Sequence, residues 1–144
     1  MSFASSAAKQ GATLASGGHR ILENTGGYYM QPTVFTDVTP DMEIFQKEVF
    51  GPVLTITPFD SEEEAVSLAN DSELGLASAV WTSNLSRAHR MIDNLRAGVV
   101  HVNTYGGANN AVPLGGIKQS GNGADKSLHA LEKYSVLKTA WIKL

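Results

Sequence analysis

From residue 52 onward, runs of β-branched and apolar residues alternate with segments of helical periodicity. Strands are predicted at Pro52–Phe59, Leu76–Thr82 and Val99–Asn103, separated by a helix that opens at Ser61 and a second helix over Asn84–Ala97. Such β-α-β-α-β alternation favours a mostly parallel sheet covered by helices. The strands are apolar on both faces, which is typical of buried parallel strands. The sequence therefore predicts an α/β fold.

Local signals mark several element ends. Ser61 and Glu64 form an S-x-x-E capping box, which fixes the start of one helix, and Gly98 stands where a glycine often follows a helix. Before residue 52 the chain predicts a helix ending at Gln10 and a short strand over residues 12–16. Pro32 interrupts the extended run from residue 28 to residue 35. After the long loop from residue 104 to residue 123, a helix over residues 125–133 and a terminal strand are predicted.

Composition excludes several classes of protein. The chain of 144 residues has a net charge of -3 and 42% hydrophobic residues, which suits a globular protein with no nucleic-acid surface. No window approaches the roughly 18 apolar residues of a membrane-spanning helix, and the first residues do not resemble a secretory signal, so a cytoplasmic location is expected. With no cysteine, the chain has no thiolate ligand or nucleophile. The four histidines lack ligand spacing, and no metal site is expected.

The glycine-rich patterns typical of phosphate binding are incomplete or absent in this chain. Gly116 and Gly121 have the spacing of a phosphate-binding loop, but Asn122-Gly123 replaces the Lys-Ser/Thr pair that would reach phosphate and magnesium. No G-x-G-x-x-G pattern follows a first strand, so no dinucleotide-binding half is visible. The loop over residues 104–123 is nevertheless longer than a structural connection normally needs, and such loops are usually functional or disordered.

The stretch KEVFGPV, residues 47–53, holds a carboxylate and an aromatic ring close together. One interpretation makes Glu48 a surface residue and Phe50 a core residue at the entrance of a strand. The other assigns them to a ligand: a carboxylate accepts two hydrogen bonds from a sugar diol while the ring packs beside a flat heterocycle. Gly51 would leave room for the ligand, and Pro52 would restrict the backbone where the chain leaves the site. Spacing alone leaves both interpretations open.

Four segments resemble, in order and spacing, the C-terminal part of NAD(P)-dependent aldehyde dehydrogenases. Together they contain the motifs E-x-F-G-P, N-x-x-x-x-G-L and G-G-x-K-x-S-G. The resemblance runs from about residue 8 to residue 144 and corresponds to about the last third of a family member. The tail KQSGNGADKSLHALEKY looks most like the branch that acts on γ-glutamylamino- and guanidino-butyraldehydes. The segments are GGYYMQPTVFTDVTPDMEIFQKEVFGPV, NDSELGLASAVWT, LRAGVVHVN and VPLGGIKQSGNG.

The resemblance assigns roles to individual residues. It implies that Glu48 and Phe50 contact the nicotinamide ribose and ring of NAD or NADP, and that Ala108 and Leu114 line the aldehyde tunnel. Leu114 stands where relatives more often have phenylalanine, and Ala108 is small where some are aromatic, so a wider tunnel is expected. Ala124 stands where relatives usually have arginine. Neither the aldehyde nor the choice between NAD and NADP follows from these residues.

The resemblance also implies domains and partners. Residues 1–134 are expected to be part of the catalytic, aldehyde-binding domain of this α/β fold, and residues 135–144 to be an oligomerisation segment. Within it, Ser135–Ile142 resembles the strand that joins the sheet of a neighbouring subunit, which implies a homo-oligomer. The expected partners are a small aldehyde and further copies of the chain, with no nucleic acid and no membrane.

In the family, a cysteine thiolate attacks the aldehyde, a hydride passes to NAD(P), and glutamate-activated water hydrolyses the thioester. Those residues lie upstream of Met1 in the family, and this chain has no cysteine. We therefore expect a C-terminal fragment of an aldehyde dehydrogenase that is inactive alone and binds NAD or NADP weakly or not at all. The alternative is a non-catalytic binding or assembly module that pairs through exposed strands.

Overall fold

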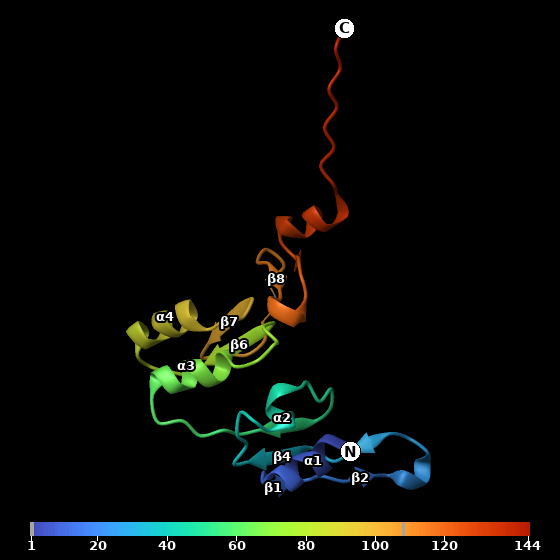
Figure 1. Ribbon diagram of the computed structural model, residues 1–144, viewed down its shortest axis with the longest axis vertical. Coiled ribbons are helices and arrows are strands. Elements are labelled where there is room, and N and C mark those ends of the chain that lie inside the picture. The colour runs from blue at the N-terminus through green and yellow to red at the C-terminus, as the bar shows by residue number, and fades with distance from the viewer. Residues whose placement is uncertain (1, 108) are drawn as a thin grey trace. The chain divides into compact units, whose positions relative to one another are not determined.

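The computed structural model describes residues 2–107 and 109–144. The chain divides between Ser72 and Glu73 into two compact units, which are described in turn (Figure 1). The α/β fold class is confirmed, since helices and strands alternate along the chain and two strand pairs are parallel. The other three pairs are antiparallel. Among the described residues, no helix is long and apolar enough to cross a membrane.

The first unit is built on a three-stranded sheet. Strand β4 (Thr33–Thr36) lies between β1 (Thr13–Ser16), which is antiparallel to it, and β5 (Val53–Thr55), which is parallel to it. The expected break at Pro32 is present and separates β4 from β3 (Tyr29–Met30). The other elements of this unit are helix α1 (Ser2–Gln10), strand β2 (Arg20–Ile21), the 3-10 turn η1 (Glu23–Thr25), helix α2 (Glu43–Gln46) and helix α3 (Glu62–Asn70).

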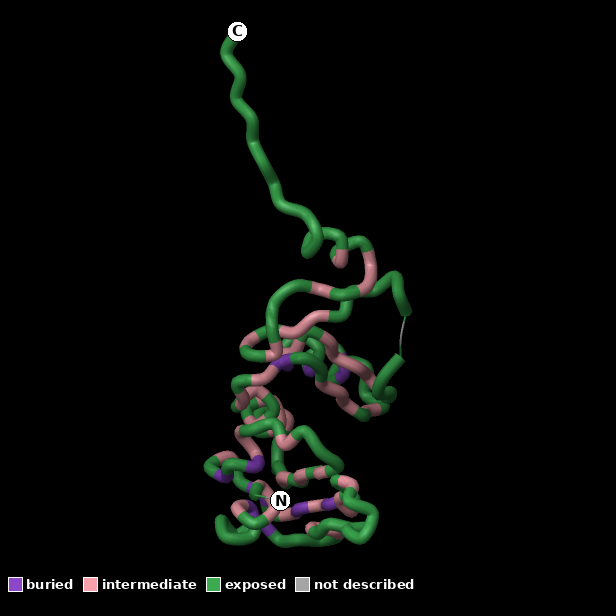
Figure 2. Tube along the Cα trace, turned by 90° about the vertical axis from the view of Figure 1, so that its right-hand side faces the viewer, coloured by how far each residue is buried: buried purple, intermediate pink, exposed green. Residues whose placement is uncertain are grey.

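The core of the first unit lies between the sheet and helices α1 and α2. Phe35 of β4 is 1% exposed, and Ala7 of α1 and Ile44 of α2 pack into the same cluster. Helix α2 is held from outside the cluster as well, because the Gln10 side-chain oxygen accepts a hydrogen bond from the Glu43 N–H at 3.1 Å. The segment that follows α2 therefore starts from a fixed position. Figure 2 shows in purple the buried residues of this unit and of the second one.

The second unit contains one parallel strand pair and one antiparallel pair. Strand β6 (Ala77–Val80) pairs with β7 (Val99–Val102) in parallel, joined by helix α4 (Leu85–Asn94) as in a β-α-β unit. Strand β8 (Leu114–Gly115) pairs with β9 (Ala124–Asp125) in the antiparallel sense. Two 3-10 helices complete the unit, η2 (Lys118–Ser120) and η3 (Leu128–Tyr134).

The predicted starts of α3 and α4 are confirmed, and the predicted end of α4 is not. The Ser61 Oγ accepts from the Glu64 N–H at 3.1 Å, while the Glu64 carboxylate accepts from the Asp60 N–H at 2.7 Å. Helix α4, predicted to reach Ala97, ends at Asn94. Gly98 is needed for packing rather than for a helix end, because a Cβ there would lie 1.8 Å from the Gly115 carbonyl oxygen. Its small size lets β8 approach the start of β7.

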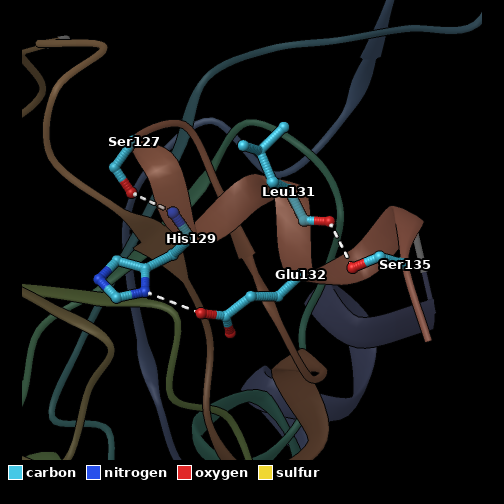
Figure 3. A network of polar contacts seen from close by, with 5 residues as sticks. All are labelled: Ser127, His129, Leu131, Glu132 and Ser135. Carbon is cyan, nitrogen blue, oxygen red and sulfur yellow. Dashed lines mark hydrogen bonds and ion pairs between the residues drawn. The ribbon is translucent and has the colours of Figure 1, made fainter. Parts of the chain in front are cut away.

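Two predictions near the C-terminus are wrong as local structure. The helix expected over residues 125–133 is the 3-10 helix η3, which begins only at Leu128 because residues 124–125 pair as β9. Ser127 caps it by accepting from the His129 N–H (Figure 3). Residues 135–144, expected as a strand, form neither helix nor strand and are exposed throughout (Figure 2). A strand needs a neighbour to pair with, and none of the described residues offers one here.

Candidate functional site

Residues 47–52 connect α2 to β5 and are anchored at both ends. The Lys47 N–H donates to the Glu43 carbonyl at 2.9 Å, which closes α2. At the other end, the Val53 N–H donates to the Gly51 carbonyl at 2.7 Å, a three-residue turn centred on Pro52. The Pro52 carbonyl accepts from the Thr33 N–H at 2.9 Å and so starts the pairing of β5 with β4. Both ends of this connection are therefore set by the sheet and by α2.

Between these anchors, one side chain faces inward and its two neighbours do not. Val49 is partly buried and packs against the core cluster. Glu48 is exposed, and Phe50 is 90% exposed. A Cβ on Gly51 would meet no atom within 4 Å, so the space beside it is open. The expectation of a core phenylalanine at the strand entrance is therefore wrong, because Val49 fills the place that Phe50 would have taken.

The backbone of Phe50 lies in the left-handed region, with φ of 52°. Residues with a Cβ avoid this region at a cost of roughly 1–2 kcal/mol, and a bulky residue there calls for an explanation. Burial gives no compensation, since the ring is almost fully exposed. Strain of this kind gathers at ligand sites, where the surrounding structure imposes it. The observation favours the interpretation that Glu48 and Phe50 face a ligand.

Replacing Phe50 by glycine measures how much the left-handed backbone at this residue lowers the stability of the fold. Glycine adopts a positive φ freely and the lost ring is exposed, so Phe50→Gly is expected to raise the free energy of unfolding by about 1 kcal/mol. The measurement is urea-induced unfolding followed by circular dichroism. Tyr28→Gly is the matched control, because Tyr28 is 97% exposed and has no positive φ. It should lower stability; an equal loss in both variants would contradict the strain at Phe50.

Leu114, which is expected to line the aldehyde tunnel, lies in the second unit. Leu114 on β8 is 37% exposed and lines a surface cavity of about 730 Å³. The close approach of Gly115 to Gly98 fixes the position of β8 relative to β7. Ala108 lies outside the described residues. The cavity is lined by Val99, His101, Gly106, Gly107, Asn109, Val112, Pro113, Leu114 and Lys126.

Ala124, which stands where an arginine was expected, lies on β9 and is partly buried. It lines a separate cavity of about 480 Å³ together with Pro113, His129 and Lys133. Next to it, the Lys133 ammonium donates to the Asp125 carboxylate and ties η3 to β9. This hydrogen bond is the main reason that the pKa of Asp125 lies below its usual value and the pKa of Lys133 above its own.

Sequence reasoning did not single out Lys126 or Asn109, although both line the same cavity as Leu114. Asn109 belongs to no recognisable motif, and Lys126 lies in the tail KQSGNGADKSLHALEKY, where the resemblance assigned it no role. Lys126 also has a positive φ of 59°, a backbone conformation that no residue pattern around it indicates. Among the described residues, no group of three histidine or acidic side chains could hold a metal ion.

Comparison with known proteins gives a family. The sequence profile described as the Aldehyde dehydrogenase family matches residues 1–140. The NADP/NAD-dependent aldehyde dehydrogenase PuuC of Escherichia coli K12 is 60% identical over 113 residues, which are 78% of this chain and 23% of that protein. A betaine aldehyde dehydrogenase of Rhizobium etli is 52% identical over 134 residues, 92% of this chain and 28% of that protein.

Solved structures agree with the sequence comparison. An indole-3-acetaldehyde dehydrogenase in complex with NAD+ matches 99% of this chain and 29% of its own, with a TM-score of 0.92 and 54% identity. The aldehyde dehydrogenase KauB of Pseudomonas aeruginosa matches the same shares, with a TM-score of 0.91 and 55% identity. This chain thus spans less than a third of the length of the relatives it resembles.

Proposed function

Because the chain belongs to the aldehyde dehydrogenase family, we propose that its 144 residues do the work of the matching part of an NAD(P)-dependent aldehyde dehydrogenase. The whole enzyme would oxidise a small aldehyde to a carboxylate in the cytoplasm. Its sulfur nucleophile would have to come from outside these residues, since they contain no cysteine. The 60% identity to PuuC supports a place in the branch that acts on γ-glutamylamino- and guanidino-butyraldehydes.

The observation that carries the proposal is the exposed pair Glu48 and Phe50 on a connection that is otherwise anchored. These residues fit the nicotinamide end of NAD or NADP. The two carboxylate oxygens of Glu48 suit the two ribose hydroxyls as hydrogen-bond acceptors, and the ring of Phe50 offers an apolar face to the nicotinamide. When bound, the cofactor accepts a hydride. The chain's own part is to hold the reactive end of the cofactor in place, and two residues alone would hold it weakly.

Leu114 and Ala108 are proposed to line the aldehyde tunnel within a catalytic, aldehyde-binding part formed by residues 1–134. The cavity beside Leu114 supports this proposal, since its walls are partly apolar and it has room for a small organic molecule. The leucine is smaller than the phenylalanine that relatives more often carry. A wider tunnel is therefore proposed for this chain.

A chimera tests the proposed function. The matching segment of Pseudomonas aeruginosa KauB, 29% of that protein, is replaced by the 144 residues of this chain. The rest of KauB then supplies whatever this chain lacks. The chimera should form NADH or NADPH from hexanal. A chimera that folds with native circular dichroism and remains inactive would contradict the proposal.

Residues 135–144 are proposed to pair with a second copy of the chain, which would make the protein a homo-oligomer. Leu137, Trp141 and Ile142 are between 79% and 105% exposed. The total accessible surface is 10609 Å². A compact protein of 15.3 kDa would expose about 7,100 Å², and two separate compact units of half that mass about 8,600 Å². The chain therefore exposes more surface than a compact monomer of this mass.

The oligomer proposal predicts a concentration-dependent mass. The chain should sediment as a monomer at low concentration and as a larger species at high concentration, because its exposed tail gains partners by mass action. Removing residues 135–144 should shift this association to at least about tenfold higher concentration, a change of about 1.4 kcal/mol. Tyr28→Ser, which removes an equally exposed ring from the first unit, is the control and should leave sedimentation unchanged. Unaltered association after removal of the tail would exclude it as the contact.

A further inference from the structure

The cavity beside Leu114 is lined by both apolar and polar residues. Two valines, a proline and Leu114 are apolar, and a histidine, an asparagine and a lysine carry the polar groups. No aspartate or glutamate is among the residues that line it. Within the part of the chain that the structure describes, the charge on this lining is therefore positive. The apolar residues are Val99, Val112, Pro113 and Leu114, and the polar ones His101, Asn109 and Lys126.

Lys126 is held at the cavity by its neighbours in the chain. It links β9 to η3 with a φ of 59°, and it is partly buried. The next residue fixes the direction of the backbone, because the Ser127 N–H donates to the Asn110 carbonyl at 2.7 Å. This bond ties the start of η3 to the same loop that forms the cavity wall. The position of Lys126 relative to that wall is thus set by a backbone contact.

The ammonium of Lys126 has no hydrogen-bond partner among the described residues. Its nearest acid in the sequence is Asp125, but the Asp125 carboxylate is bonded to Lys133. Lys126 acts on Asp125 only as the weakest of the influences that change its pKa. Asp125 therefore does not neutralise Lys126 by direct contact. The three N–H donors of this lysine are left to interact with whatever enters the cavity.

Asn109 presents a second donor to the same cavity. Its side-chain oxygen accepts from the Ala111 N–H at 2.9 Å. The oxygen is thereby engaged, and the NH₂ group remains as the hydrogen-bonding end of the amide. His101 lines the same cavity, with its ring centre 5.7 Å from that of Tyr105. The uncommitted groups of Lys126 and Asn109 are donors, which is the complement of an anion.

We propose that this cavity takes an aldehyde whose far end carries a carboxylate, and that Lys126 is the residue that selects it, with Asn109 as a second donor. The inference rests on the proposed function for the assignment of the cavity to the aldehyde. Charge-assisted hydrogen bonds from an ammonium to a carboxylate are about twice as strong as neutral ones. The same charge disfavours a cationic aldehyde. Within the proposed branch it therefore favours the γ-glutamylamino aldehyde, which carries a carboxylate, over the guanidino aldehyde, which is a cation. Betaine aldehyde, named for the Rhizobium etli relative, carries a quaternary ammonium.

Binding to the chain itself tests the anion preference without any catalysis. Hexanoate, hexanol and hexylammonium have equal chain lengths and differ only in the charge of one end. Titration followed by amide NMR should show hexanoate shifting residues 99–101, 109–114 and 126 at about tenfold lower concentration than hexanol. Hexylammonium should bind more weakly than either. Equal affinity for the three compounds would overturn the proposal.

Variants assign the preference to one side chain. Lys126→Met keeps the length and the backbone strain but removes the charge, and it should abolish the difference between hexanoate and hexanol. Lys126→Arg should retain it. Lys138→Met makes the same change in net charge within the exposed tail and should leave the preference intact. A preference that survives Lys126→Met, or disappears equally in Lys138→Met, contradicts the role of Lys126.

The chimera with KauB separates this proposal from the proposed function. Its kcat/KM for 6-oxohexanoate should exceed that for hexanal by about tenfold, and Lys126→Met should bring the ratio of the two values close to one. A chimera that oxidises both aldehydes equally refutes the anion preference and leaves the proposed function standing. A chimera that oxidises neither, while hexanoate still binds through Lys126, refutes the proposed function and supports the anion site.

Discussion

The 144-residue chain alone is expected to form no NADH or NADPH from any aldehyde, however long the incubation. Oxidation of an aldehyde through a covalent adduct needs a nucleophile that adds to the carbonyl carbon. The hydrogen on that carbon can then leave as a hydride. A thiol suits this step because part of it is thiolate at neutral pH. No cysteine is present in this chain. The isolated chain is therefore expected to have none of the aldehyde-oxidising activity of an intact enzyme.

The measurement is absorbance of the reduced cofactor with hexanal and each of NAD+ and NADP+. The KauB chimera serves as the positive control, because it carries the same 144 residues together with the remainder of a full-length relative. Activity in the chimera and none in the isolated chain would locate the missing chemistry outside these residues. Reduction of the cofactor by the purified chain would contradict the claim that the nucleophile lies outside these residues.

Glu48→Gln in the chimera is expected to lower kcat/KM by about a hundredfold. The carboxylate accepts two hydrogen bonds from a vicinal diol, whereas the amide that replaces it has one acceptor oxygen and turns a donor toward the second hydroxyl. Misplacement of a reacting group by about 1 Å costs about a hundredfold in rate. Since Glu48 is exposed in the first unit, its substitution removes no packing, and circular dichroism should not change.

Two further measurements separate positioning from folding. Glu63→Gln changes the same charge on the exposed face of α3 and should leave kcat/KM within about twofold, as expected for a surface substitution remote from a site. A fall mainly in kcat, at saturating NAD+, would mean that the cofactor still binds but is held poorly. Unchanged kinetics in Glu48→Gln would remove this residue from the site, even if the chimera is fully active.

The parts of the fold that local chemistry decides were predictable. Ser61 caps α3 and Asn84 accepts from the Arg87 N–H at the start of α4, because short polar side chains satisfy the free N–H groups of a first turn. The parallel pairing of β6 with β7 followed from the β-α-β order. The break at Pro32 followed from a proline's missing N–H. Each of these features depends on residues that are near one another in the sequence.

The features that were missed depend on contacts between distant segments. Helix η3 starts late because residues 124–125 pair with β8, and Gly98, expected directly after a helix, instead lies close to Gly115. The terminal strand fails to form because its partner is not among the described residues. In the candidate site, the residue type of Phe50 was informative, but its left-handed backbone and its exposure were visible only in the structure. The left-handed backbone of Lys126 and its place at the cavity were likewise visible only in the structure.

The most direct test of the central claim is a crystal structure of the KauB chimera with NAD+ bound. We predict that both carboxylate oxygens of Glu48 lie within hydrogen-bonding distance, about 2.7–3.2 Å, of the nicotinamide ribose hydroxyls, with the ring of Phe50 against the nicotinamide. A bound cofactor whose ribose is held by other residues, with Glu48 and Phe50 both directed into solvent, would contradict the account.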